Sequence, residues 1–128
     1  MTRPTIVLDA NAFSSKGFRV WLALYPGKKV LPIVAYVEIG VHQEAKGKLQ
    51  HFRAYLVQSG IEIEWMRLPE ADRTIQEATP PGRFAESARD FLIASHVHGE
   101  RVLVTHNTRD FIFLKTVVTP EAAMERFS

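Results

Sequence analysis

The sequence predicts an α/β domain with a central, mostly parallel sheet. Short apolar runs rich in β-branched residues alternate with longer segments of helical period along the whole chain. The first such run, residues 5–9 (TIVLD), is β-branched or apolar until its last residue, Asp9, as in a strand buried on both faces of a parallel sheet. With 128 residues the chain can bury one core, and we expect a single domain over residues 1–128.

Proline and glycine residues mark the boundaries of the expected elements in the first half of the chain. The elements expected there are a strand over 5–9, a helix over 11–25, a strand over 29–31 and helices over 32–45 and 48–58. Pro26 and Gly27 end the first helix, in which a break near Gly17 is compatible with the sequence. Pro32 suits the first turn of the next helix, which is apolar almost all round and is therefore expected to be buried.

The second half of the chain alternates in the same way. The elements expected there are a strand over 61–66, helices over 70–78 and 83–98, a strand over 101–105, a turn with a short helix within 107–114, a strand over 116–118 and a helix over 120–127. Residues 61–66 alternate apolar and acidic side chains, which favours a strand near the edge of the sheet. Residues 79–82 (TPPG) are expected to form a loop, and Thr119 is the expected N-cap of the last helix.

The composition excludes several classes of protein. The chain has no cysteine, so disulfides and cysteine-bound zinc are ruled out and a reducing cytoplasm is the expected location. No apolar run reaches the roughly 18–20 residues of a membrane span, and Asp9 interrupts any signal-peptide core. Nucleotide-binding glycine motifs, a serine-hydrolase elbow and an HExxH pattern are all missing. The net charge of +2 is compatible with a nucleic-acid partner but decides nothing.

Four carboxylates stand where apolar elements would not ordinarily carry a charge. They are Asp9 at the end of the first strand, Glu38 and Asp90 within apolar helices, and Asp110 after a later strand. Ligands of parallel α/β sheets bind beyond the carboxyl ends of the strands, where we expect Asp9 and, after a later strand, Asp110. A structural alternative stays open: Glu38 pairs with a lysine or arginine at the helix rim, and Arg89 screens the acids of its own helix.

Carboxylate and amide oxygens are the ligands of hard cations such as Mg²⁺ or Mn²⁺. A cation would also relieve the repulsion among neighbouring carboxylates. Such ions activate water for attack on a phosphodiester, so the acids, with Asn107 beside them, predict metal-assisted phosphodiester hydrolysis.

The same residues carry a family resemblance over nearly the whole chain. The matching stretches, in order, are LDAN at 8–11, LPIVAYVEIG at 31–40, RDFLIAS at 89–95, VLVTHNTRDF at 102–111 and the closing VVTPEAAMERF. In these stretches the chain resembles the PIN-domain ribonucleases, in particular the VapC-like toxins of toxin–antitoxin pairs. Residues 46–81 carry no motif of that family.

The resemblance implies a three-layer α/β/α sandwich and an endoribonuclease that depends on Mg²⁺ or Mn²⁺. It implies RNA as the substrate, a cognate antitoxin as partner and a homodimer. The catalytic and metal-binding residues it implies are Asp9, Glu38, Asp90 and Asp110, with Asn11, Thr105 and Asn107 in supporting or substrate-binding roles. Whether Asp110 or Asn107 is the fourth ligand stays open.

Two other functions remain as alternatives. One is a PIN-like domain that binds RNA or a protein partner without cleaving, although its acids are intact. The other is a receiver-type phosphoacceptor domain, which requires an acidic pair after the first strand and a well-placed lysine after the last one. Here the acidic pair is missing and Lys115 is poorly placed.

Overall fold

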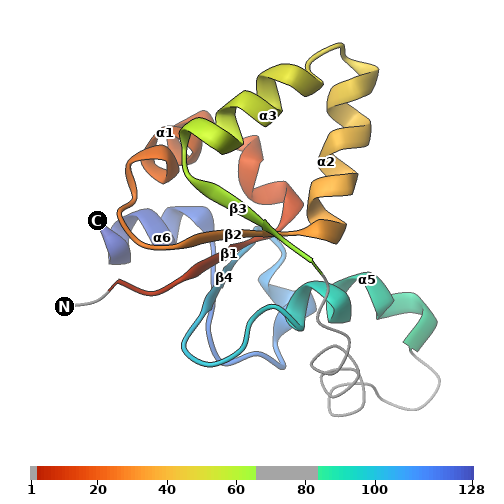
Figure 1. The fold of residues 1–128 in the computed structure, drawn as a ribbon. Helices are drawn as coiled ribbons and strands as arrows, with labels where there is room; N and C mark the ends of the chain where they lie inside the picture. Colours follow the sequence, from red (N-terminus) through yellow and green to blue (C-terminus); the bar gives the residue numbers. More distant parts are fainter. Residues whose placement is uncertain (1–2, 66–83) are drawn as a thin grey trace.

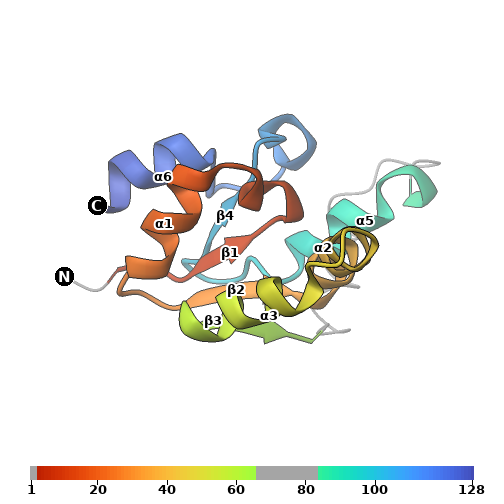
Figure 2. The same ribbon diagram turned by 90° about the horizontal axis from the view of Figure 1, so that it is seen from above.

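A parallel sheet forms the centre of the molecule (Figures 1 and 2). The computed structural model describes residues 3–65 and 84–128. The strands in this part of the chain are β1 (Ile6–Leu8), β2 (Lys29–Pro32), β3 (Ile61–Glu64), β4 (Val102–Val104) and β5 (Val117–Val118). They lie in the order β3-β2-β1-β4-β5, and every pair of neighbours is parallel. The strand order therefore reverses between β1 and β4, the kind of position at which such sheets bind ligands.

Helices cover both faces of this sheet. In the described residues they are η1 (Ala10–Ser14), α1 (Lys16–Leu24), α2 (Ile33–Ala45), α3 (Leu49–Gln58), α5 (Phe84–Ala94), η2 (Thr108–Phe111) and α6 (Pro120–Phe127). In Figure 1, α1, α2 and α3 lie above the sheet and α5 lies below it. The expected three-layer α/β/α sandwich with a parallel sheet is confirmed. None of the described helices is long and apolar enough to cross a membrane.

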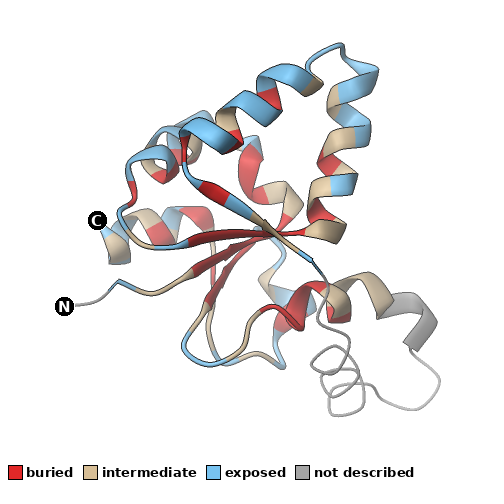
Figure 3. Ribbon diagram, in the orientation of Figure 1, coloured by how far each residue is buried: buried red, intermediate tan, exposed pale blue. Residues whose placement is uncertain are grey.

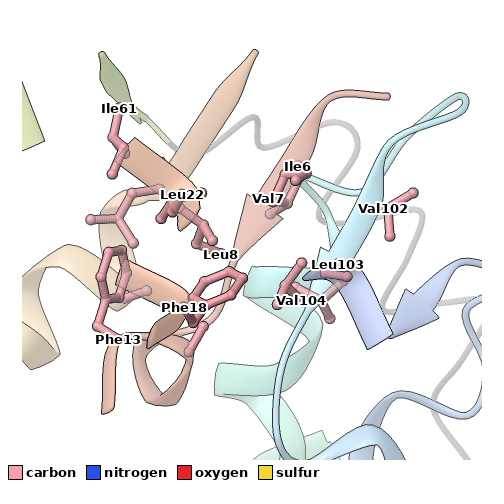
Figure 4. Packing of buried hydrophobic residues seen from close by; sticks show 14 of the residues in the cluster. Ile6, Val7, Leu8, Phe13, Phe18, Leu22, Ile61, Val102, Leu103 and Val104 are labelled. Atoms are coloured by element: carbon pink, nitrogen blue, oxygen red, sulfur yellow. The ribbon is translucent and has the colours of Figure 1, made fainter. Parts of the chain in front are cut away.

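The middle strand anchors the core. Ile6, Val7 and Leu8 have no exposed surface, and Figure 3 shows β1 buried along its length. Figure 4 shows the aromatic and aliphatic side chains that pack around it, from Phe18 and Leu22 on α1 and from the apolar residues of β4. Each fully buried aliphatic side chain contributes roughly 1.5–3 kcal/mol. This packing fixes the carboxyl end of β1, and with it the position of Asp9.

The helix expected over residues 11–25 is two helices, and the break lies at Ser15, near Gly17 as the sequence allowed. Ser15 has an extended backbone, and its Oγ accepts a hydrogen bond from the N–H of Phe18 at 3.4 Å. This is the geometry of an N-cap, so η1 ends and α1 begins around Ser15, with Gly17 inside the second helix.

The apolar helix α2 is buried on one side only, which corrects the expectation that it is buried all round. Ala35 and Ile39 face the interior, whereas Val37 and Val41 are 54% and 63% exposed. The composition of α2 indicates an apolar helix, but only the side that packs on β2, α3 and α5 has neighbours in the described part of the chain.

The remaining boundaries differ from the expected ones at their ends. The strand at 61–66 ends at Glu64 and lies at the sheet edge as expected. The helix expected to reach residue 98 ends at Ala94, where Ser95 Oγ donates to the carbonyl of Leu92 at 2.6 Å and competes with further helical turns. Thr119 caps α6 as expected. The helix over 70–78 and the loop over 79–82 lie outside the described residues.

Candidate metal centre

Asp9 lies where the strand order of the sheet reverses. It follows β1 directly, and Thr105 follows the neighbouring strand β4. The hydroxyl of Thr105 donates to Oδ2 of Asp9 at 2.7 Å, and the N–H of Ala10 donates to Oδ1 at 2.7 Å. The Asp9 side chain has no exposed surface. A buried carboxylate of this kind needs hydrogen-bond donors and a cation to offset its lost hydration.

Asn11 connects the two segments that follow β1 and β4. Its Oδ1 accepts the N–H of His106 at 3.0 Å and also lies 3.3 Å from the hydroxyl of Thr105. The N–H of Asn107 donates to that same hydroxyl oxygen at 3.1 Å. The supporting residues expected from the sequence are thus brought together at one end of the sheet, where they hold the loops around Asp9.

The cation that Asp9 contacts is Arg89 on α5. Nη2 of Arg89 donates to Oδ1 of Asp9 at 2.6 Å and to Oε2 of Glu38 at 3.1 Å. Nε donates to Oε1 of Glu38, and Nη1 donates to Oδ1 of Asp90 at 2.9 Å. Helices α2 and α5 pack against each other, which places Glu38 within reach. One guanidinium therefore joins three of the four predicted acids, each from a different segment.

This arrangement answers the question left open for Glu38. Its ion-pair partner is an arginine, and that arginine is Arg89. The sequence indicated Arg89 only as a screening charge on its own helix. Its contact with Asp9 spans 80 positions, and a local pattern does not reveal a contact of that range. The available signal was the fully apolar strand before Asp9, since a carboxylate buried there requires a nearby cation.

Charge and burial act together on the ionisable groups of the cluster. Burial by itself would lower the pKa of Arg89, but its bonds and charge interactions with Glu38 and Asp9 raise that pKa well above its ordinary value. For Asp90, burial raises the pKa, the charges of Asp110 and Asp9 raise it further, and Arg89 opposes them. One guanidinium thus only partly neutralises the acids that surround it.

Asp110 lies apart from the other three acids. It belongs to η2 and is exposed, and its N–H donates to the carbonyl of Asn107 at 3.1 Å. Within residues 3–65 and 84–128 we find no hydrogen bond or ion pair from its carboxylate. Its charge nevertheless acts on Asp90, which places Asp110 at the rim of the cluster.

A cavity of about 800 Å³ opens beside the cluster. Glu38, Arg89, Asp90, Asn107 and Asp110 all line it. It is also lined by polar and cationic side chains that the sequence did not single out, namely Arg19, His42, Gln43 and Lys46. These come from α1 and from α2 and the residue after it.

The donor set suits a hard cation, but the oxygens are not arranged around one. Carboxylates with nearby amide and hydroxyl oxygens match the ligands of Mg²⁺ or Mn²⁺. Among the described residues, no group of three or more histidine, aspartate or glutamate side chains is spaced to hold a metal ion. The guanidinium of Arg89 lies between the carboxylates instead.

The protein is therefore an α/β/α sandwich, and its polar cluster lies at the carboxyl ends of the strands of a parallel sheet. No family model and no curated protein matches the sequence. Among solved structures, the chain is similar to one in a toxin–antitoxin complex from Klebsiella pneumoniae, with a TM-score of 0.68 and 22% sequence identity. The match covers 90% of this chain and 97% of the other. At that identity the likeness shows a shared fold.

Proposed function

We propose that this chain is a Mg²⁺- or Mn²⁺-dependent endoribonuclease of the PIN-domain type and the toxin of a toxin–antitoxin pair. The observation that carries the proposal is the meeting of Asp9, Glu38 and Asp90 around one cation at the strand switch point. The motifs that resemble the PIN family contain these same acids. A chain of similar fold was solved in a toxin–antitoxin complex, which supports a place for this chain in such a pair.

In this proposal Asp9, Glu38 and Asp90 hold the metal ion, and Asp110 with Asn107 completes the set or orients the attacking water. Thr105 and Asn11 hold Asp9 and the loop after β4 in place. When bound, the ion would lower the pKa of a coordinated water and offset the charge that develops on the phosphodiester.

The cavity has the size and charge for a segment of RNA. Arg19 and Lys46 line it together with the acids, and cationic side chains contribute most of the affinity for a phosphate backbone. We further propose that a cognate antitoxin covers this cavity and that the chain forms a homodimer in the cytoplasm. The exposed Val20, Leu24 and Val57 on α1 and α3 are apolar surface that a dimer would bury.

The test is cleavage of RNA by the purified chain with Mn²⁺ or Mg²⁺ and, separately, with excess EDTA. We expect cleavage only with the metal, and its loss by a factor of about 100 or more in Asp9→Asn. Glu62→Gln is the matched control, because Glu62 is an exposed acid on β3 that pairs with Lys28 outside the cavity. The control should cleave RNA and inhibit growth like the wild type. Equal cleavage by Asp9→Asn, with an unchanged circular dichroism spectrum, would contradict the proposed site.

A second candidate is a PIN-like domain that binds RNA or a protein without cleaving it. The observation in its favour is that Arg89 already neutralises part of the acid cluster. This candidate predicts metal-independent RNA binding and no cleavage by the wild type at any Mn²⁺ concentration. A filter-binding assay alongside the cleavage assay separates the two functions.

A further inference from the structure

The guanidinium of Arg89 uses all three of its nitrogens on the acid cluster. Nη2 contacts Asp9 and Glu38, Nε contacts Glu38, and Nη1 contacts Asp90. The planar fork of arginine matches a carboxylate with two parallel bonds, and it does so here with Glu38. The group that occupies the centre of the acids is therefore a side chain of the protein itself.

A guanidinium and a divalent ion cannot share this centre. Mg²⁺ requires oxygens at about 2.0–2.1 Å in near-octahedral order, so its ligands must approach one another closely. The guanidinium lies between Asp9, Glu38 and Asp90 and keeps their oxygens at hydrogen-bond distances from its own nitrogens. In this geometry the described acids form no metal-binding group. A metal ion can reach them only after the guanidinium has left.

Arg89 is free to leave without a change in the fold. Its side chain is 38% exposed and lines the cavity, whereas Asp9 is fully buried. The long arginine side chain can turn into the cavity by rotation about its own bonds. Asp90 is the next residue on α5, and a rotation within the Arg89 side chain requires no movement of the backbone of that helix.

We propose that Arg89 is a built-in competitor of the metal, so that its guanidinium and a divalent cation bind Asp9, Glu38 and Asp90 alternately. The inference rests on the proposed metal-dependent function of the same site. In the metal-free protein Arg89 partly neutralises the acids and holds them together. When a metal enters, the displaced guanidinium lies in the cavity, where a phosphate of the substrate can bind it.

The test is the affinity of the purified, chelator-treated protein for Mn²⁺, measured from the electron paramagnetic resonance signal of free Mn²⁺. Because Arg89→Gln removes the competing cation and leaves the acids unneutralised, we expect its Kd to be at least about tenfold lower than that of the wild type. Arg109→Gln is the matched control: it removes the same charge from an exposed position next to Asp110. Its Kd should stay within about twofold of the wild-type value.

The outcomes separate the inference from the function on which it rests. If neither the wild type nor Arg89→Gln binds Mn²⁺, the proposed metal site is wrong and the competition falls with it. If both bind with the same Kd, or Arg89→Gln binds more weakly, only the competition is overturned and the metal site stands. An equally large decrease of the Kd for Mn²⁺ in Arg109→Gln would show a general charge effect and would also overturn the competition.

A measurement on the wild type covers the case in which Arg89→Gln does not fold. The Nε–H of Arg89 is held by Glu38, so its nuclear magnetic resonance signal should be resolved and slow to exchange in the metal-free protein. Addition of Mg²⁺ should move this signal to the position of a solvated arginine and speed its exchange. A signal unchanged at saturating Mg²⁺ would overturn the competition.

Discussion

The pairing of Asp9 with Arg89 predicts a strong energetic coupling between two residues 80 positions apart. Their atoms lie 2.6 Å apart, and one partner is fully buried. Unit charges about 4 Å apart at an effective dielectric constant near 20 attract by about 4 kcal/mol. The Arg89 side chain is 38% exposed, so solvent screens part of this attraction, and we expect a coupling of about 2 kcal/mol.

A double-mutant cycle in EDTA measures this coupling. Arg89→Gln leaves the buried charge of Asp9 without its cation and should lower the free energy of unfolding by about 3 kcal/mol. Asp9→Asn removes the ion pair but also the cost of burying a charge, so about 1 kcal/mol is expected. The double variant should then lose about 2 kcal/mol rather than the sum of both losses.

The assay is urea unfolding at pH 7, followed by circular dichroism. Arg101→Gln combined with Asp9→Asn is the matched control, because Arg101 pairs with Glu64 and not with the cluster. That pair should be additive within about 0.5 kcal/mol. Additivity of the Asp9 and Arg89 variants within the same limit would refute the central role given to the guanidinium.

Three further predictions concern the support of the site and of the fold. Thr105→Val keeps the side-chain shape but removes a donor to the buried carboxylate of Asp9. Urea unfolding should show that the free energy of unfolding falls by about 2 kcal/mol. A decrease below about 0.5 kcal/mol would contradict the contact. In Gly27→Ala the added Cβ would lie 2.6 Å from the buried ring of Tyr25, so we expect the free energy of unfolding to fall by about 1–3 kcal/mol. Gly17 has an open position in α1, so Gly17→Ala should be neutral or stabilising by about 0.5 kcal/mol. Thermal melts that rank the two variants the other way would be contrary evidence. Burial alone would raise the pKa of Glu64, but hydrogen bonds from Arg101 and His96 lower that pKa overall. The contribution of Glu64 to stability is therefore present above its ordinary pKa of 4.5 and is lost on acidification. The stability difference between wild type and Glu64→Gln should shrink from pH 7 to pH 4, and a constant difference would count against these contacts.

Local patterns were sufficient for the sheet and for the position of Asp9. An apolar β-branched run that ends in a charge predicts a buried strand with a polar group at its carboxyl end, and β1 with Asp9 has that form. The acids at Glu38 and Asp90 were indicated because a charge in an apolar helix needs a partner. They meet at the site because α2 and α5 pack against each other.

Contacts that depend on tertiary packing were beyond the reach of the sequence. The exposure of Val37 and Val41 depends on which side of α2 has neighbours, which composition does not encode. The same holds for Arg89, since a long side chain can reach a cluster or solvent from the same helical position.

Because residues 89 and 90 are neighbours on α5, the proposed exchange depends on movement of the Arg89 side chain and not of the helix. Consecutive helical residues point about 100° apart, so only a long side chain at position 89 can reach the acids that Asp90 already faces. A shift of the helix that withdrew Arg89 would also withdraw Asp90 and dismantle the cluster. The exchange therefore has to be a side-chain rotation, with β1 and α5 unmoved. In the proposed exchange, Arg89 partly neutralises the acids in the absence of metal, and the same carboxylates would be open to a divalent ion once the side chain has turned away.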